Sequence, residues 1–315
     1  MPKFFFGTRS LQDFPRGCVL TIGAFDGVHL GHQAIISRLR EQSAALGLPA
    51  IAVTFYPDPI QYFKPDQAPS QIMNLREKTI SLLDAGVDAV ACLPFNSEVR
   101  NMAAADFVEG FLLERLGAKY IIVGDDFRFG AGREGDFKLL ESAGQKHGFV
   151  TERAETLEYN GERVSSTRLR KLLQNGELAA AETLFGRSYE LCGRVIRGRQ
   201  LGRELGFPTA NIPLKRKQVP ISGVFAVRAK VGDGWIDSVA NIGYRPTVNH
   251  LDIPLLEVHL LDYQSDLYGQ HLRVRFGKKL RDEKSFDSVE SLTLAIQEDI
   301  SQARKWFQEQ SLPPE

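Results

Sequence analysis

The sequence lacks the features that mark several large classes of protein. Only three cysteines occur among its 315 residues, Cys18, Cys92 and Cys192, and no Cys-x-x-Cys pair is present. An odd number of widely spaced cysteines argues against a disulfide framework and predicts buried thiols in a reducing compartment, so we expect a cytoplasmic protein. No apolar run approaches the length of a membrane-spanning helix, and the N-terminal stretch predicts no signal peptide.

An excess of charge of either sign is also missing. Lys plus Arg number 39 and Asp plus Glu number 39, a balance that argues against a protein that wraps nucleic acid. No Gly-x-x-x-x-Gly-Lys-[Ser/Thr] motif occurs, so any ATP must be bound without that phosphate loop. Repeats and low-complexity tracts are absent, and 43% of the residues are hydrophobic, which is typical of a globular protein. The length predicts two domains.

Residues 1–186 alternate short β-rich runs with helical patterns, which predicts a parallel sheet with crossover helices. Ligands of such sheets bind beyond the carboxyl ends of the strands, where polar clusters follow Ile22, Phe55 and Val123. Two short helices, broken at Asn175-Gly176, are expected to end this part.

Residues 187–315 contain short strand candidates separated by Gly, Pro and Asp, which predicts a small closed β-barrel. The stretch VGDGW at 231–235 is a hairpin signal. Apolar residues at helical spacing over 288–310 predict a C-terminal helix packed on the barrel. The predicted fold is therefore an α/β domain with a Rossmann-like parallel sheet at 1–186, followed by a small antiparallel β-barrel with a C-terminal helix at 187–315.

The loop at 21–33, TIGAFDGVHLGHQ, joins a buried strand to a helix and is a candidate anion site. Free N–H groups and the positive end of the helix dipole lie there, and Gly23, Gly27 and Gly31 let a ligand approach the backbone. His29 and His32 are three residues apart, so both imidazoles can face one phosphate. The alternatives are that the histidines cap the helix or bind a metal. Zinc would need a third ligand, and we rank it below phosphate.

A second polar cluster, RVSSTRLR at 163–170, places Ser166 and Thr167 at an expected helix start with Arg170 one turn later. Hydroxyls, backbone amides and a guanidinium form a phosphate clamp. Serine and threonine before a helix are more often caps when taken alone. Combined with the histidine loop, the pattern favours phosphate.

The second half offers a separate candidate site. Thr209 and Asn211 alternate with Ala210, which places two hard oxygen ligands suited to Mg²⁺ on one face of an extended segment. In LLEVHLLDY, at 255–263, period-two alternation separates Glu257 and His259 from the apolar face. Glu257 either meets water on an exposed face or acts as a general base toward an attacking hydroxyl.

The stretches GAFDGVHLGH at 23–32 and VSSTRLR at 164–170 resemble the nucleotidyltransferase half of the prokaryotic bifunctional riboflavin kinase/FAD synthetase family, and VGDDFRFG at 123–130 resembles a further motif of it. The resemblance runs through nearly the whole chain. It implies that His29 and His32 contact the ATP phosphates, and that Asp126 lies near the nucleotide and flavin phosphates. The implied ATP-binding residues are Gly23, Phe25, Asp26, His29, His32, Asp126, Ser166, Thr167 and Arg170.

The stretch FYPDPIQYF at 55–63 fits the same family except at Asp58, where the family usually has histidine. The role of this position is therefore open. Phe55, Pro57 and Phe63 are implied to bind flavin together with Asp126, although burial in the core is the alternative that we favour for Phe55.

In the second half, GFPTANI, GVFAV, ANIGYRPTV, EVHLLD, LYGQHLRVRF and LRDEKSF occur in the order found in the riboflavin kinase barrel. This resemblance implies that Thr209 and Asn211 bind Mg²⁺ and ATP phosphate and that Glu257 activates the terminal ribityl hydroxyl of riboflavin. The glycine-rich segment containing Gly198, Gly202 and Gly206 is implied to cover the nucleotide. Arg281 stays open between a flavin contact and an exposed ion pair.

The predicted function is bifunctional: phosphorylation of riboflavin to FMN in the barrel, then adenylylation of FMN to FAD with release of pyrophosphate in the N-terminal domain. The substrates are ATP, riboflavin and FMN; we expect no nucleic-acid or membrane partner, and the oligomeric state is not predicted. One alternative is a nucleotidyltransferase for another phosphorylated acceptor with a non-catalytic barrel. The other is an oligonucleotide-binding barrel whose basic patch would be Arg194, Arg197, Arg199 and Arg203 with KRK at 215–217, although residues 194–206 lack aromatic side chains for base stacking.

Overall fold

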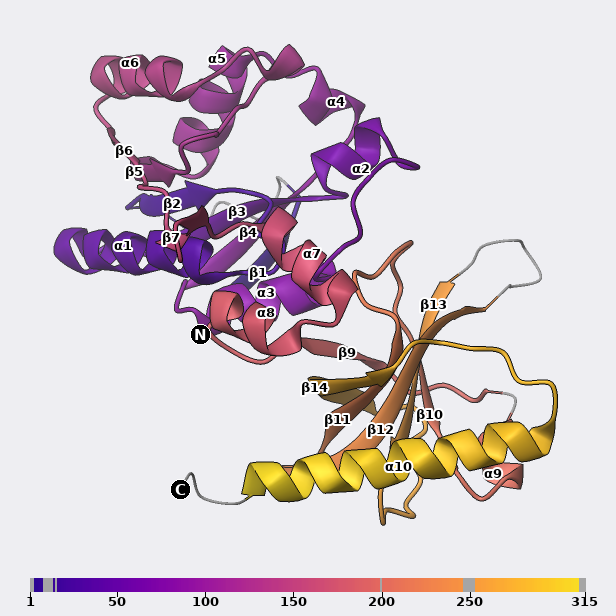
Figure 1. The fold of residues 1–315 in the computed structure, drawn as a ribbon. Helices are drawn as coiled ribbons and strands as arrows, with labels where there is room; N and C mark the ends of the chain where they lie inside the picture. Colours follow the sequence, from indigo (N-terminus) through magenta and orange to yellow (C-terminus); the bar gives the residue numbers. More distant parts are fainter. Residues whose placement is uncertain (1–2, 8–13, 15, 199, 246–252, 312–315) are drawn as a thin grey trace. The chain divides into compact units, whose positions relative to one another are not determined.

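The computed structural model describes residues 3–7, 14, 16–198, 200–245 and 253–311 (Figure 1). Arg199 and the last three residues of ANIGYRPTV therefore lie outside the described residues.

The chain forms two compact units. The first consists of Met1–Pro69 and Leu75–Ser165, and the second of Ser70–Asn74 and Ser166–Glu315. The sequence analysis divided the chain between residues 186 and 187, according to the two predicted activities. That division stays a prediction.

The first unit is built on a parallel sheet of six strands in the order β1-β4-β3-β2-β5-β6. The four interior strands are buried along most of their length, as expected when helices cover both faces of a sheet. The strand ends expected near Ile22, Phe55 and Val123 are those of β2, β3 and β5. The edge strands β1 and β6 were missed, because four residues carry little periodicity. The strands are β1 (Lys3–Phe6), β2 (Cys18–Ile22), β3 (Ala50–Tyr56), β4 (Ala89–Pro94), β5 (Ala118–Val123) and β6 (Val150–Arg153).

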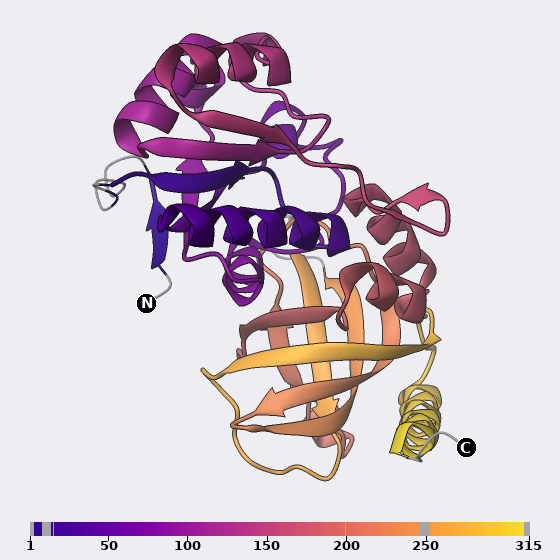
Figure 2. The same cartoon turned by 90° about the vertical axis from the view of Figure 1, so that its left-hand side faces the viewer.

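Helices cover both faces of this sheet. Figure 1 shows α1 and α3 on one face and α5 and α6 on the other, and the rotated view of Figure 2 agrees. A short hairpin of β7 (Glu158–Tyr159) and β8 (Glu162–Arg163) ends the unit. The helical segments are α1 (Leu30–Leu46), α2 (Pro59–Phe63), α3 (Leu75–Asp84), α4 (Ser97–Arg100), α5 (Ala104–Asp106), the π-helical η1 (Phe107–Arg115), the 3₁₀ turn η2 (Ala131–Arg133) and α6 (Phe137–His147).

The second unit contains an antiparallel sheet of six strands in the order β10-β13-β12-β11-β14-β9 (Figure 2). The two edges approach one another where the Ile196 N–H donates to the Asn211 carbonyl at 2.8 Å, so the sheet is nearly closed into the predicted barrel. The strands are β9 (Glu190–Arg194), β10 (Ala210–Pro213), β11 (Gly223–Val231), β12 (Gly234–Arg245), β13 (Ile253–Leu260) and β14 (His271–Arg281).

The predicted hairpin and C-terminal helix of this unit are confirmed. The two short helices expected at the end of residues 1–186 form as α7 and α8 but belong to this unit, and the four-residue α9 was not predicted. Val231 pairs with Gly234, and Gly232 in the turn between them has a φ of 56°. Ala303 and Phe307 of the C-terminal helix are buried in one cluster with β11 and β12 side chains. The helices are α7 (Ser166–Asn175), α8 (Leu178–Phe185), α9 (Leu201–Glu204) and α10 (Val289–Ser311).

An ion pair fastens α10 to the barrel. The Arg281 guanidinium donates from Nε and Nη2 to the carboxylate of Asp299 at 2.8–3.2 Å. The Asp299 side chain is 6% exposed and that of Arg281 is 23% exposed. Of the two alternatives for Arg281, the structure therefore shows an ion pair, and a largely buried one.

We expect Asp299→Ala to lower the free energy of unfolding by about 3 kcal/mol, because it leaves the Arg281 guanidinium uncompensated in a largely buried place. The measurement is the denaturant transition followed by tryptophan fluorescence. Asp262→Asn is the control, because Asp262 also pairs with an arginine of the chain but is 75% exposed, and asparagine tolerates its φ of 56°, so we expect little change. Equal effects of the two substitutions would contradict this account.

Candidate functional site

The strand order of the first unit reverses between β2 and β5, which makes this place the topological switch point of the sheet. These strands are neighbours, yet the chain leaves β2 toward β3 on one side and leaves β5 toward β6 on the other. Ligands of open α/β sheets bind outside the carboxyl ends of the strands at such a reversal. The histidine loop follows β2 and Asp125-Asp126 follow β5, so topology brings two of the predicted polar clusters to this point.

The histidine loop is tightly folded. Phe25 is 2% exposed, and Asp26 and His29 are 8% and 6% exposed. His29 is the N-cap of α1: its Nδ1 accepts a hydrogen bond from the main-chain N–H of His32 at 3.4 Å. The first turn of α1 contains no acidic side chain, so the positive end of its dipole favours an anion. The capping alternative is thus correct for His29, and it leaves the anion site intact.

The two imidazoles form a stack. Their centroids are 3.7 Å apart with the planes inclined by 17°, and the Phe25 ring lies edge-on to His32 with the centroids 5.2 Å apart. A Cβ built on Gly31 would lie 3.2 Å from the His29 ring, which shows how closely the backbone approaches it. Nδ1 of His32 is buried and has no hydrogen-bond partner among the described residues.

Burial lowers the pKa of His32 well below 6.5, and the nearby charges of His29, Lys78 and Arg163 lower it further. The imidazole is therefore neutral at pH 7. Because Nδ1 of His29 accepts a hydrogen bond, a neutral His29 ring carries its proton on Nε2 and can donate it to a phosphate oxygen. The stack can thus act as a hydrogen-bond donor without carrying full positive charge.

The polar cluster after β5 is held by an arginine. Arg163 Nη2 donates to Asp125 at 2.8 Å and lies 3.4 Å from Asp126. The hydroxyl of Thr156 donates to Asp125 at 2.7 Å, and this bond, with the charge of Arg163, holds the pKa of Asp125 below its usual value. Asp126 has a side chain that is 77% exposed. The predicted residue is thus at the surface, while its unpredicted neighbours Asp125 and Arg163 fix the loop.

The hydroxyl cluster begins a helix of the second unit. Ser166 is the first residue of α7, Thr167 is exposed, and the Nε of Arg170 donates to the Ser70 carbonyl at 2.8 Å. The helix start at Ser166 was predicted. The hydrogen bond from Arg170 to Ser70, which joins two residues of the second unit, was not predicted.

The residues predicted to bind flavin lie around an aromatic cluster formed by Phe55, Tyr62, Phe63 and Phe95. Phe55 is half-buried against the core of the first unit, which agrees with the alternative favoured for it. Phe63 is 53% exposed, and the Arg100 guanidinium lies 5.2 Å from its centroid. Pro57 is half-buried.

Asp58, the position at which the chain departs from the family pattern, has a local structural role. It is the N-cap of α2, and its carboxylate accepts from the Ile60 N–H at 3.1 Å. Aspartate is a preferred N-cap residue.

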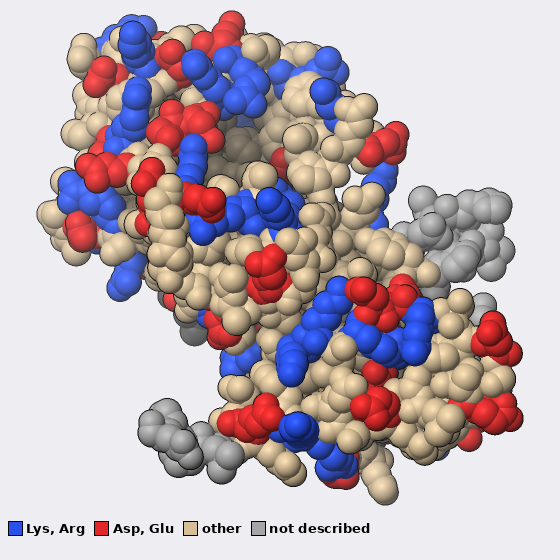
Figure 3. All heavy atoms as spheres, viewed as in Figure 1, with Lys and Arg blue, Asp and Glu red and all other residues tan. Residues whose placement is uncertain are grey.

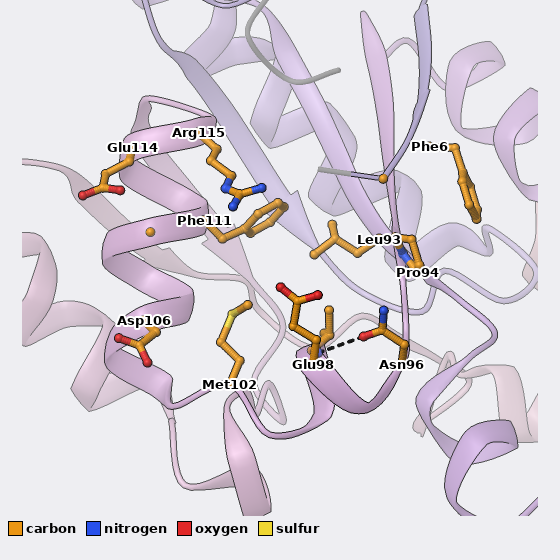
Figure 4. Close-up of a pocket in the computed structure, with 13 residues that line it drawn as sticks. Phe6, Leu93, Pro94, Asn96, Glu98, Met102, Asp106, Phe111, Glu114 and Arg115 are labelled. Carbon is orange, nitrogen blue, oxygen red and sulfur yellow. Dashed lines mark hydrogen bonds between the residues drawn. The ribbon is translucent and has the colours of Figure 1, made fainter. Parts of the chain in front are cut away.

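A cavity of about 490 Å³ opens beside the carboxyl ends of β1 and β4 (Figure 4). Leu93 and Pro94 line it from β4, Met102 from the link between α4 and α5, and Phe111 from η1. Asn96 and Glu98 lie at the same cavity. None of the predicted site residues lines this cavity.

Strand register builds the candidate site of the second unit. Glu257 on β13 pairs with Asn211 on β10 and with Asn241 on β12. Directly paired residues project their side chains on the same face with Cβ atoms about 5 Å apart, so a carboxylate lies between two amides. Leu256 and Val258 are buried while Glu257 is half-buried, which confirms the predicted alternation along β13.

The glycine-rich segment packs closely on these residues. A Cβ on Gly198 would lie 2.7 Å from the Asn211 amide, and one on Gly202 would lie 2.5 Å from the Phe207 carbonyl and 3.5 Å from the Thr209 hydroxyl. Glycine is required at both positions for this approach. Gly206 has a φ of 87°, and Thr209 is half-buried just before β10. The structure thus brings the segment next to Thr209 and Asn211.

Charged side chains of both signs are intermingled on the face shown in Figure 3. No group of three or more His, Cys, Asp or Glu side chains that could hold a metal ion occurs in the part of the chain that the structure describes. Within the same residues, no helix is both long and apolar enough to cross a membrane.

Comparisons with known proteins agree with the order of the two sites. The family model for FAD synthetase matches residues 11–168, and that for riboflavin kinase matches residues 185–307. The bifunctional riboflavin kinase/FMN adenylyltransferase of Pseudomonas fluorescens is 47% identical over 95% of this chain and 96% of its own. The enzyme of the same name from Escherichia coli K12 is 45% identical over 97% of this chain and 98% of its own. A crystal structure described as a macrolide-efflux protein from Streptococcus pneumoniae shares the fold, with a TM-score of 0.78 and 26% identity over 96% of this chain and 99% of that one.

The lowered pKa of His32 predicts a pH dependence of stability. Below pH 6.5 the unfolded chain takes up a proton on this imidazole that the folded chain does not, so stability is lost as the pH falls through that window. In His32→Asn this loss disappears. We expect the unfolding free energy to fall less steeply between pH 6.5 and 5, by up to about 1.4 kcal/mol per pH unit. Denaturant titrations at several pH values measure it, and parallel slopes for the two proteins would show that His32 titrates normally.

Proposed function

The chain belongs to the bifunctional riboflavin kinase/FMN adenylyltransferase family, and from this premise we propose which of its residues carry out the two reactions. It is a transferase that phosphorylates riboflavin with ATP to give FMN and transfers adenylate from a second ATP to FMN to give FAD. The observation that carries this conclusion is the pair of family matches in the order FAD synthetase, riboflavin kinase along one chain. We divide the activities at residues 186 and 187, and the riboflavin kinase match beginning at 185 supports that division.

We assign adenylyl transfer to the mouth of α1. A phosphate oxygen of FMN attacks the α-phosphorus of ATP, the bond from that phosphorus to the bridging oxygen breaks, and pyrophosphate leaves. Negative charge grows on the departing oxygens, and the Nε2–H of His29 and the ring of His32 are suited to meet it. The positive end of the α1 dipole acts in the same direction. Gly23, Phe25 and Asp26 shape the loop that holds these rings.

We assign Ser166, Thr167 and Arg170 to the triphosphate as well. This assignment is supported by the position of Ser166 and Thr167 at the start of α7, where main-chain N–H groups and the helix dipole favour an anion. For Arg170 to reach a phosphate, its bond to the Ser70 carbonyl must be exchanged for one to the ligand.

We assign the flavin ring to the exposed side of the aromatic cluster, with Phe63, Pro57 and the edge of Phe55 as its contacts. This assignment is supported by the exposure of the Phe63 ring, which is 53% exposed on the helix that follows β3. Asp126, also at this edge, is assigned to the nucleotide and flavin phosphate region, where the neighbouring Arg163 offsets its charge.

We assign riboflavin phosphorylation to the row Asn211, Glu257 and Asn241. Glu257 accepts the proton of the terminal ribityl hydroxyl as its oxygen attacks the γ-phosphorus of ATP, and ADP leaves. Thr209 and Asn211 offer a hydroxyl and an amide oxygen, which fit a hard cation bound together with phosphate oxygens. Mg²⁺ at this place would neutralise phosphate charge and orient the γ-phosphoryl group. Gly198, Gly202 and Gly206 form the backbone that covers the nucleotide.

We also place the protein in the cytoplasm. The support is that Cys18 and Cys92 are buried thiols; burial raises the pKa of Cys18 to about 12 and that of Cys92 to about 11. Such thiols are typical of a reducing compartment.

Glu257→Gln should reduce the rate of FMN formation from riboflavin by roughly 10²- to 10⁴-fold, because the amide cannot accept the hydroxyl proton. FAD formation from supplied FMN should be unchanged. Chromatography of the flavins after incubation with ATP and Mg²⁺ measures both. Glu290→Gln, at an exposed glutamate of the same unit, is the control. Full kinase activity in Glu257→Gln would remove Glu257 from the mechanism.

His29→Asn should reduce the rate of FAD formation from FMN by roughly 10²- to 10³-fold and leave riboflavin phosphorylation unchanged. Asparagine is chosen because it remains a good N-cap, so the helix start is kept while the imidazole is lost. His147→Asn, far along the chain on α6, is the matched control. If His29→Asn removed both activities from a folded protein, the assignment of separate sites would be wrong.

A further inference from the structure

Lys78 is a buried cation that no carboxylate balances. It lies in the first turn and a half of α3 and is 6% exposed. Its Nζ donates to the hydroxyl of Thr54 at 3.5 Å, and it forms no ion pair with any residue that the structure describes. The adjacent Glu77 is also buried, but it has an interaction of its own, and successive helix residues do not face one another. A buried ammonium without a counter-ion is costly to keep, so its retention calls for an anion that arrives later.

The position of Lys78 is at the ligand-binding edge of the sheet. Thr54 lies near the carboxyl end of β3, is fully buried, and donates from its hydroxyl to the Ala24 carbonyl at 3.4 Å. Ala24 belongs to the loop between β2 and α1 that carries His29. Thr54 pairs with Cys92 on β4, and the Cys92 thiol, with its pKa raised to about 11, supplies no negative charge. Lys78 is therefore connected to the histidine loop through Thr54, and the Cys92 thiol beside Thr54 supplies no counter-charge.

A second observation points to the same place. Nδ1 of His32 is buried with no hydrogen-bond partner among the described residues, and the charge of Lys78 is one of the causes that lower the pKa of His32. A cation without an ion-pair partner and a ring nitrogen without a hydrogen-bond partner, both among the described residues, thus lie near each other at the start of α1. Both would be satisfied by a ligand that brings several anionic oxygens, as a chain of phosphates does.

We propose that Lys78 binds the phosphates of the nucleotide in adenylyl transfer, and holds the pyrophosphate group as it departs. The proposal rests on the proposed function of the histidine loop. It assigns to α3 a role that no motif of the sequence indicated. Lys78 acts as a point charge below the phosphates, while the histidine rings and the helix N-terminus donate hydrogen bonds.

Lys78→Met tests this in the full chain, because methionine keeps the length of the side chain and removes the charge. The assay is the reverse reaction, in which pyrophosphate attacks FAD to give FMN and ATP, a reaction that reports on the adenylyl site alone. We expect the KM for pyrophosphate to rise roughly tenfold or more, as for the loss of a charged hydrogen bond. Riboflavin phosphorylation should be unchanged, and the melting temperature of the ligand-free protein should stay equal or rise, since an unbalanced buried charge is removed. Arg76→Met, at an exposed position of the same helix, is the control and should change none of these.

A structural lysine would behave differently. If Lys78 served only to hold Thr54, Lys78→Met would lower the melting temperature while the KM for pyrophosphate stayed near that of the parent, and the proposal would be overturned. An unchanged KM with unchanged stability would overturn it too. If the parent protein itself made no FAD from FMN and ATP, the proposed function would fail first, and that outcome is distinguishable because it appears without any substitution.

Discussion

A neutral His32 imidazole stacked on the His29 ring at the start of α1 determines how the first unit can meet a nucleotide. Rings 3.7 Å apart resist protonation of both, because two positive charges would face each other at that distance in a largely buried place. One ring nitrogen of His29 is already used to cap the helix, so the remaining nitrogen is directed to donate. Attraction for the triphosphate must then come from the helix dipole and from Lys78 and Arg163 around the stack. Hydrogen bonding and charge are supplied by different groups.

The second site applies a different constraint. A general base must lie where an attacking hydroxyl can reach it. The barrel places Glu257 between the amides of Asn211 and Asn241 by register alone. The glycine-rich segment approaches within van der Waals distance of Asn211 because glycine leaves the space free. Strand register and a close backbone cover thus define this site.

Features set by neighbouring residues along the chain could be predicted from the sequence. The histidine loop was found because it follows an apolar run and opens a helix, and the two faces of β13 followed from a period of two. Partners set by sheet order could not be predicted. Thr54, Lys78 and Ala24 meet only because β2, β3 and α3 pack together, and Asn241 reaches Glu257 only through the pairing of β12 with β13. The edge strands β1 and β6 were missed because four residues carry little pattern.

We propose above all that the N-terminus of α1, with its two histidines, binds the phosphates of ATP. A crystal structure of the protein with ATP tests this directly. Phosphate oxygens within hydrogen-bond distance of the His29 and His32 rings are the result that we predict. A nucleotide bound away from both rings, or a transition metal held between them, would contradict the account.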